Sequence, residues 1–262
     1  MKKITVIRSA RSSYQVIDLY CNIWSSWGFE VINHIGCRDI PESDLYILHI
    51  DLSVIPSDFC EAIKSLPRVL NGDILDIRKK RFGLILKPES PYTGPVLVKT
   101  NCNYGGFPEA AYARSQNSNC PDRAIRTLNP FSYPIFKSKL DVPSEVWSCP
   151  DLIVQPFLNT KEKNLYFVNY YDFFGAKEFS GRIGSRNPIV KFSNSQIDEP
   201  VKLPKLVRHW RKKLKIDYGR IDYIQQGENI FLLDVNKTEG AGDIANYMDD
   251  YKFLAEGIYD FL

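Results

Sequence analysis

The fold is decided by two stretches, Gly219-Arg-Ile-Asp-Tyr-Ile224 and Leu233-Asp-Val-Asn-Lys-Thr-Glu-Gly240, near the end of this 262-residue sequence. Each contains a run rich in apolar residues, and turn-forming residues separate the two runs, which is typical of β-strands joined by a hairpin. We predict strands over Gly219–Gln225 and Ile230–Val235, with the hairpin over Gln226–Asn229. This pairing determines which side chains of the two strands can meet.

Three oxygen-bearing side chains fall on the predicted hairpin. Residues i and i+2 of a strand point to the same face, so Asp234 and Asn236 project together, and Asp222 on the partner strand can face the same way. Two carboxylates and an amide oxygen suit a hard cation such as Mg²⁺. The alternative is a hairpin whose polar residues face solvent. It explains Asp234 less well, because Asp is disfavoured in strands and this one follows Phe231-Leu-Leu233. Spacing alone leaves both interpretations open.

A lysine at the end of a second apolar run provides another candidate. Lys99 follows Val96-Leu-Val98 and leads into a polar turn that contains Gly105 and Gly106. A lysine leaving a buried strand can reach a phosphate, and the backbone N–H groups of a Gly-Gly turn can cradle others. The alternative is an exposed lysine beside an ordinary turn. No GxxxxGK[ST] motif is present, so the sequence does not encode a P-loop.

A third apolar run, Asp151-Leu-Ile-Val-Gln155, continues into Pro156, Phe157 and Leu158. Proline lacks an N–H group but keeps its carbonyl, which could accept a hydrogen bond from an adenine amino group. The alternative is a core strand that ends at a proline.

The first 70 or so residues alternate between strand and helix patterns. We predict the order β-α-β-β-α-β, a small α/β unit. Its strands are expected over Ile4–Ile7, Phe29–Ile35, Leu45–Ile50 and Val69–Leu70, and its helices along the stripe of Tyr14, Ile17, Cys21 and Trp24 and over Ile55–Ser65. Further on, we predict a helix over Ile74–Phe82, a strand pair over Leu165–Phe174 and Ala176–Phe179, and a helix over Leu203–Lys215.

Composition excludes several classes of protein. The chain has 34 Lys and Arg against 31 Asp and Glu, a net charge of +3, with 44% hydrophobic residues. These values are ordinary for a folded globular protein and argue against disorder, collagen and a disulfide miniprotein. The six Cys are scattered without a CxxC pair, so we expect no zinc site. No apolar run is long enough for a membrane span, and the first residues read as a strand rather than a signal peptide. We therefore expect a cytoplasmic protein with free thiols.

The stretch 202–215 is strongly basic and supports a different class, a module that binds nucleic acid or an acidic partner. However, Leu203, Val207, Trp210 and Leu214 form an apolar stripe along the same predicted helix. A core helix with a solvated basic face explains the pattern without a ligand. We therefore do not expect nucleic acid as a partner.

Taken in order, the lysine after an apolar strand, the apolar strand ending in a hinge, and the Asp…Asp-x-Asn pattern resemble the ATP-grasp superfamily. The segment Asp234–Gly240 is similar to the metal motif of ribosomal-protein glutamate ligases. The resemblance covers essentially the whole chain and is strongest over 96–106, 151–158 and 219–240. It implies a small N-terminal α/β pre-grasp domain, residues 1–72, followed by an α+β ATP-grasp domain, residues 73–262. That domain would divide into a central nucleotide-binding part, 73–158, and a C-terminal metal-binding part, 159–262.

The resemblance also implies roles for individual residues. Asp222, Asp234 and Asn236 would hold two Mg²⁺ ions that bridge the β- and γ-phosphates of ATP, and Arg182 would steady the transferring phosphoryl group as a catalytic residue. The residues expected around ATP are Lys99, one of Lys79 and Lys80 (Lys79 being favoured), Gly105, Gly106, Gln155, Pro156, Phe157 and Leu158.

ATP-grasp ligases convert a carboxylate to an acyl phosphate, which an amine then attacks. The resemblance therefore implies an ATP- and Mg²⁺-dependent carboxylate–amine ligase acting on a small molecule or a peptide, without a membrane partner. Similar enzymes are often homodimers. A kinase-like enzyme that phosphorylates a hydroxyl, and a nucleotide-binding protein without catalysis, remain alternatives. Pro156 replaces an acidic hinge residue common in the family, and the sequence does not specify the acid or the amine.

Overall fold

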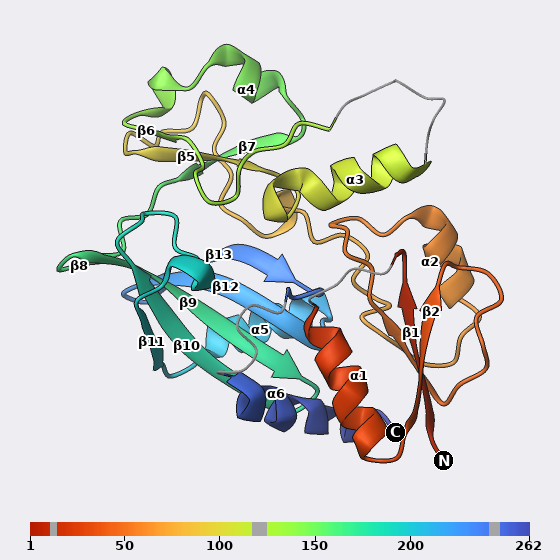
Figure 1. Ribbon diagram of the computed structural model, residues 1–262. Helices are drawn as coiled ribbons and strands as arrows, with labels where there is room; N and C mark the ends of the chain where they lie inside the picture. Colours follow the sequence, from red (N-terminus) through yellow and green to blue (C-terminus); the bar gives the residue numbers. More distant parts are fainter. Residues whose placement is uncertain (11–14, 117–124, 241–246) are drawn as a thin grey trace.

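Three β-sheets organise the chain in the computed structural model, which describes residues 1–10, 15–116, 125–240 and 247–262 (Figure 1). An N-terminal parallel sheet is followed by a small antiparallel sheet and then by a large antiparallel sheet at the C-terminal end. This mixed α/β architecture agrees with the predicted fold class. The predicted boundaries after residues 72 and 158 fall between the sheets, and the division into domains remains a prediction.

The N-terminal sheet is parallel and has the strand order β2-β1-β3-β4. Its elements are β1 (Lys3–Arg8), α1 (Val16–Ser26), β2 (Glu30–Ile35), β3 (Leu45–Leu48), α2 (Ser57–Ile63) and β4 (Val69–Leu70). Side chains of β3 point alternately to the two faces, so Leu45 and Ile47 pack with α1 while Tyr46 and Leu48 pack with α2. The predicted β-α-β-β-α-β order is confirmed, except that Tyr14 lies outside the described residues.

The small sheet is antiparallel with the order β6-β5-β7. Its elements and the helices around it are the 3₁₀ turn η1 (Lys79–Arg81), β5 (Val96–Thr100), η2 (Tyr104–Gly106), α3 (Phe107–Gln116), β6 (Ile135–Phe136), η3 (Lys139–Asp141), α4 (Ser144–Ser148) and β7 (Leu152–Pro156). The predicted helix over Ile74–Phe82 is wrong, because only η1 is helical there. Instead, the Ile77 N–H donates to the Ser53 carbonyl and the Lys79 N–H to the Asn101 carbonyl. These tertiary hydrogen bonds replace the bonds of a helix.

The C-terminal sheet has the order β11-β10-β9-β12-β13, all antiparallel, with β8 paired to β9. Its strands are β8 (Lys161–Glu162), β9 (Leu165–Phe174), β10 (Lys177–Ser185), β11 (Ile197–Pro200), β12 (Tyr218–Gln226) and β13 (Asn229–Asn236). The accompanying helices are η4 (Phe192–Asn194), α5 (Lys205–Leu214), α6 (Met248–Ala255) and η6 (Glu256–Asp260). The predicted hairpin is confirmed as β12–β13, whereas β10 extends well beyond the predicted Ala176–Phe179.

The two faces of the C-terminal sheet differ because side chains alternate along each strand. Tyr171 and Phe173 of β9 face a core that includes Val207 of α5. Tyr170 and Asp172 therefore point to the opposite face, which we call the front face; the face covered by α5 is the rear face.

A shared core joins the C-terminal sheet to the N-terminal sheet. Helices α1 and α6 lie side by side between them (Figure 1). The indole N–H of Trp24 donates to the Ala255 carbonyl at 2.9 Å, and both residues belong to a cluster that also contains Phe174 and Tyr218. The two sheets are therefore held together by buried apolar contacts. No helix in the described ranges is both long and apolar enough to cross a membrane.

Candidate functional site

The hairpin β12–β13 presents four polar side chains on the front face. Asp222 lies opposite Asp234, and Arg220 lies opposite Asn236. Directly opposed residues of an antiparallel pair project to the same side of the sheet. The predicted set of Asp222, Asp234 and Asn236 therefore shares one face, and Arg220 joins it.

Two lysines from different elements converge on Asp234. Lys79 Nζ of η1 lies 2.8 Å from Asp234 Oδ1, and Lys99 Nζ of β5 lies 3.0 Å from Oδ2. Burial alone would raise the pKa of Asp234, but the ammonium groups of Lys79, Lys99 and Lys191 outweigh it and hold that pKa well below its usual range. Burial also lowers the pKa of Lys79 to about 8, despite its ion pair with Asp234. The carboxylate is therefore ionised and surrounded by positive charge.

Lys79 and Lys80 point in different directions. The Lys79 ammonium group is buried and also donates to the Cys102 carbonyl and to Asn103 Oδ1. The exposed Lys80 reaches only the Pro150 carbonyl, at 3.4 Å. Of the two candidates, only Lys79 lies at Asp234.

The carboxylate and amide oxygens of the hairpin are of the type that binds a hard cation. Asn236 Oδ1 accepts from Asn103 Nδ2 at 2.8 Å, and Asp222 Oδ1 accepts from Arg220 Nε at 2.9 Å. Across the ranges that the structure describes, no group of three or more His, Cys, Asp or Glu side chains forms a metal site. A cation at the hairpin would therefore need further oxygen ligands from outside the chain, as Mg²⁺ takes from substrate phosphates.

A narrow cavity of about 90 Å³, the hinge cavity, opens beside these charges between β7 and the C-terminal sheet. Lys99, Asp222 and Asp234 line its charged end. The rest of its wall is mainly apolar, and comes from Leu84, Leu97, Tyr133, Gln155, Pro156, Phe157, Leu158, Val168, Ile189, Ile224, Phe231 and Leu233 among others. The four consecutive residues predicted around adenine thus lie together, within one cavity that ends at the lysines.

A second cavity of about 510 Å³, the acidic cavity, lies on the other side of the charged group. Its carboxylates are Asp51, Glu109, Asp222, Asp234 and Glu239, against the cations Lys191 and Arg220. Glu109 Oε1 accepts from the Ser53 N–H, and Asp51 Oδ1 accepts from Thr238 Oγ1. The two cavities share Tyr133, Val168, Val190, Lys191, Asp222 and Asp234. The charged group therefore separates an apolar cavity from an acidic one.

Arg220 is held between carboxylates and aromatic rings. Its Nε lies 3.8 Å from Asp172 Oδ1, and its guanidinium group stacks 4.4 Å from the ring centre of Tyr170 and 4.1 Å from that of Phe192. Burial raises the pKa of Asp172 to about 6 even beside this arginine. Burial, and then the charge of Asp172, raise the pKa of Glu239 well above its usual range. Arg220 is thus a fixed cation whose partners are ionisable.

The structure does not bring Arg182 to the front face. β10 continues to Ser185 and pairs Arg182 with Asn169, one residue before Tyr170, so the arginine projects from the rear face. There it pairs with Glu199 and Glu162 and stacks over Phe167 at 4.4 Å. We assign Arg182 to the packing of the sheet and not to the site.

The Gly105-Gly106 turn is tightly constrained. Both glycines have positive φ, +65° and +75°, and a Cβ on Gly105 would lie 2.0 Å from the Leu128 carbonyl oxygen. Only glycine fits there without strain. Neither glycine is among the described residues that line the hinge cavity or the acidic cavity, whereas the neighbouring Tyr104 lines the acidic cavity.

Sequence reasoning missed two cations of the site. Arg220 stands two residues before Asp222, so strand periodicity already placed the two side chains on one face. Lys191 lies in the segment after β10, and Asp234 acts on its pKa against the lowering effect of burial. No local sequence pattern indicates that approach, since Lys191 reaches the site only through the tertiary fold.

Comparison with known proteins gives structural but not sequence similarity. No family model matches the sequence, and no curated protein matches it either. The macrocyclase MdnC of Microcystis aeruginosa, bound with precursor peptide MdnA, aligns with TM-score 0.61 and 13% identity over 98% of this chain and 99% of MdnC. A RiPP-associated ATP-grasp ligase of Chryseobacterium gregarium, in complex with ADP and a leader and core peptide, aligns with TM-score 0.60 and 12% identity. The alignment covers 100% of this chain and 98% of that ligase. A RimK domain ATP-grasp protein of Sphaerobacter thermophilus aligns with TM-score 0.56 and 8% identity, over 98% of this chain and 99% of that protein. With these full-length matches, and with the lysines and the hairpin described above, the chain has the fold of the ATP-grasp superfamily.

Proposed function

We propose that the chain is an ATP- and Mg²⁺-dependent ligase that joins a carboxylate to an amine through an acyl phosphate. The observation that carries the proposal is the wall shared by the two cavities. An apolar cavity suited to a nucleobase meets an acidic cavity at Lys191, Asp222 and Asp234. Phosphates placed at this wall would lie between the base and a second substrate, as phosphoryl transfer requires.

The hinge cavity would take the adenine ring between apolar side chains, with Gln155 and the backbone of Pro156, Phe157 and Leu158 beside it. Lys79, Lys99 and Lys191 would then face the phosphates. At about 90 Å³ the cavity is smaller than the roughly 300–1,000 Å³ of typical ligand sites. ATP binding would therefore require the small sheet and the C-terminal sheet to move apart.

Asp222, Asp234 and Asn236 would hold Mg²⁺, which when bound neutralises charge on the β- and γ-phosphates. We place two ions here, following the resemblance to ATP-grasp ligases. In the structure, Lys79 and Lys99 neutralise Asp234. When phosphates and cations bind, these lysines would turn from Asp234 to phosphate oxygens, so the buried charges would keep partners throughout.

Arg220 would take the catalytic role that the resemblance implied for Arg182. A substrate carboxylate oxygen would attack the γ-phosphorus, the bond between that phosphorus and the β,γ-bridging oxygen would break, and ADP would leave. Arg220 lines the acidic cavity beside Asp222 and can donate to the oxygens that gain charge. The amine would then form the C–N bond as the C–O bond to phosphate breaks, and inorganic phosphate would leave.

The acidic cavity favours an amine as the second substrate. Asp51, Glu109 and Glu239 add negative charge beyond the metal-binding pair, which would attract an ammonium group. Burial raises the pKa of Asp51, so this carboxylate can take a proton as the amine becomes nucleophilic. The neighbours from Microcystis and Chryseobacterium are in complex with peptides, which supports a peptide as the source of at least one reacting group.

The decisive experiment is ADP release measured with a panel of amino acids and short peptides, with product masses read out. A ligase releases ADP and free phosphate only with an acid–amine pair, and its product mass equals the two substrates minus water. A kinase would retain the phosphate on its product. Release of ADP with a hydroxyl acceptor and a phosphorylated product would overturn the ligase.

The same assay with Asp234→Ala tests the site. The variant should lose ATP-dependent turnover, because it removes a proposed metal ligand and the partner of two lysines. Circular dichroism should still report a folded chain. Full turnover by the folded variant would contradict the assignment of Asp234.

A further inference from the structure

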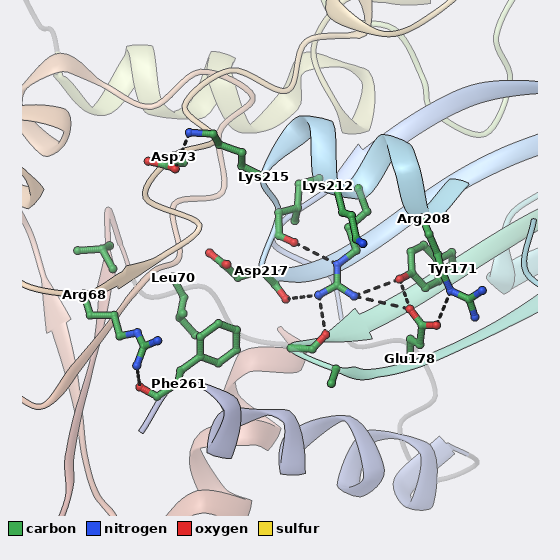
Figure 2. A pocket seen from close by; sticks show the side chains of 15 residues that line it. Arg68, Leu70, Asp73, Tyr171, Glu178, Arg208, Lys212, Lys215, Asp217 and Phe261 are labelled. Atoms are coloured by element: carbon green, nitrogen blue, oxygen red, sulfur yellow. Dashed lines mark hydrogen bonds and ion pairs between the residues drawn. The ribbon is translucent and has the colours of Figure 1, made fainter. Parts of the chain in front are cut away.

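A sizeable cavity lies away from the proposed active site. The rear cavity, of about 670 Å³, opens on the rear face of the C-terminal sheet. Its walls come from β4 and the turn after it, from the β9–β10 turn, and from α5 (Figure 2). It lies where the N-terminal sheet meets the C-terminal sheet, and the proposed reaction uses none of its residues.

The rear cavity is predominantly basic. Its wall contains the cations Arg68, Arg208, Arg211, Lys212 and Lys215 against the carboxylates Asp73, Glu178 and Asp217, a net charge of +2. Four of the five cations belong to α5 or to its C-terminal cap. The basic stretch noted in the sequence is therefore not a uniformly solvated face, since part of it forms the wall of a cavity.

Helix α5 has two separate stripes, which explains how it can be both a core helix and a cavity wall. Val207, Trp210 and Leu214 pack against the rear face of the sheet. An adjoining side of the helix carries a basic stripe whose residues recur every three to four positions: Arg208, then Arg211 and Lys212, then Lys215. Core packing thus orients the basic stripe toward the cavity.

Two of the cations are already used within the protein. Arg211 donates to the carbonyls of Gly175 at 2.6 Å and Asp217 at 3.0 Å, and stacks 4.0 Å from the ring centre of Phe173. Lys215 pairs with Asp73 at 3.0 Å. Arg211 therefore serves as part of the frame of the cavity.

The other cations keep free donors. The Lys212 ammonium group has no hydrogen bond or ion pair with any described residue. Arg208 uses its Nε for Glu178, and Arg68 uses one terminal nitrogen for the Phe261 carbonyl (Figure 2). These two arginines stand on opposite sides of the cavity in the view, so free cationic donors border it from both the N-terminal part and α5.

We propose that the rear cavity docks an acidic peptide segment. The identity of this segment as part of the peptide substrate rests on the proposed ligase function. The free donors of Arg68, Arg208 and Lys212 would pair with Asp or Glu side chains. The carboxylates in the same walls would accept hydrogen bonds from peptide N–H groups. Single-stranded DNA fits less well, because every nucleotide brings a phosphate and its sugar-phosphate backbone has no group that can donate to those carboxylates.

The position of the cavity predicts the shape of the substrate. Docking occurs on the rear face, whereas the proposed reaction occurs on the front face. An extended peptide rises about 3.3 Å per residue, so a segment of roughly ten residues can reach about 33 Å, from the rear face toward the front face. Docking would therefore hold the substrate while its reacting group lies some ten residues away.

The test is fluorescence anisotropy of the full chain with a labelled Glu-Ser repeat peptide, roughly ten residues long to match that reach, and a Gln-Ser peptide of equal length as the uncharged control. Lys212→Glu and Lys213→Glu are a matched pair, since both change an exposed lysine of α5 but only Lys212 lines the cavity. We expect Lys212→Glu to weaken binding of the acidic peptide about three- to tenfold and Lys213→Glu less than about twofold. Matching melting curves would show that both variants fold.

Several results would overturn the proposal. One is equal weakening by the two variants, or equal binding of the two peptides. Another is displacement of the peptide by a non-hydrolysable ATP analogue, which would place it at the front face. Tighter binding of single-stranded DNA that Lys212→Glu weakens would replace the peptide with nucleic acid.

A further variant separates this inference from the proposed function. Asp234→Asn should lose turnover but bind the Glu-Ser peptide with unchanged affinity. If wild-type protein binds the peptide in this way yet never forms a C–N bond, docking stands and the ligase fails. If the ligase works on short substrates but Lys212→Glu leaves peptide affinity unchanged, the ligase stands and docking fails.

Discussion

Arg220 and Arg211 are similar in surroundings but differ in their partners. Their side chains are 13% and 15% exposed, and each guanidinium group stacks about 4 Å from the ring centre of a phenylalanine. Arg220, on the front face, pairs with the carboxylates of Asp172 and Asp222. Arg211, on the rear face, also has a carboxylate 3.8 Å away, on Glu178, but its hydrogen bonds to the main chain go to the carbonyls of Gly175, Ile216 and Asp217.

The partners of an arginine, and not its burial, thus separate the two roles. A carboxylate can be protonated or can turn to another cation, so an arginine paired with it can accept a new anionic partner. A backbone carbonyl is fixed by the fold and needs its donor permanently. We therefore expect Arg220 to act in the reaction and Arg211 in stability, and the following changes test that distinction.

The largest expected effect is that of Arg220→Met on turnover. Removing a donor aimed at developing charge typically costs about 100- to 1,000-fold in kcat. ADP release with the identified substrate pair measures this loss, and Arg220→Lys is the control that keeps the charge but loses the planar fork. Unchanged kcat in a folded Arg220→Met variant would remove Arg220 from the site.

Arg211→Met should show the opposite pattern. It removes the arginine donor from the carbonyls of Gly175 and Ile216, while the Asp217 carbonyl keeps the Gly175 N–H, and we expect a loss of about 2–3 kcal/mol in the free energy of unfolding. Urea denaturation measures this quantity. Below the unfolding transition, turnover per folded molecule should stay within about twofold of wild type. A hundredfold loss of kcat at wild-type stability would make the comparison of the two arginines invalid.

A stabilising change is expected at Lys237, a fully buried lysine whose ammonium group has a single long contact, 3.4 Å to the Ile74 carbonyl. Burial lowers its pKa to about 7. The unfolded chain keeps this proton up to its ordinary pKa of about 10.4, so the lysine destabilises the fold fully below pH 7 and progressively less as pH rises toward 10.4. Lys237→Met should therefore raise the free energy of unfolding by about 1–2 kcal/mol at pH 6, and by less at pH 9. A gain that grew with pH would contradict this sign.

The smallest expected effect is that of Lys80→Met. This exposed lysine points away from Asp234, so we expect kcat and KM for ATP to change less than about twofold. Lys79→Met, one residue earlier, should reduce ATP turnover strongly because its ammonium group lies at Asp234. Equal losses in the two variants would show that the direction of these side chains differs in the working enzyme.

The hairpin and its three metal-binding candidates could be predicted from sequence because strand periodicity is local. Asp222, Asp234 and Asn236 needed only the alternation of two neighbouring strands. The assignment of Arg182 failed for a related reason, since the predicted strand stopped at Phe179. Extending β10 to Ser185 puts Arg182 in register with Asn169, and a shift of one residue decides the face.

Other features depend on contacts that no local pattern encodes. The stretch before Lys79 has a plausible helical pattern, but hydrogen bonds to Ser53 and Asn101 keep it extended. Lys191 comes near Asp234 only when the segment after β10 folds back. The rear cavity likewise needs Arg68 and Arg208, far apart in sequence, to face one another. The sequence contained the basic stretch, but not the cavity wall that it forms.

The hydrogen bond from Trp24 to the Ala255 carbonyl links residues 231 positions apart. A ribosome adds about 5–20 residues per second, so Trp24 emerges roughly 10–50 s before its partner is made. During that interval α1 has the N-terminal sheet to pack on, but its other contacts, Phe174, Tyr218 and Leu254, do not yet exist. The first part of the nascent chain therefore keeps an apolar side of α1 uncovered until Met248–Ala255 has been synthesised.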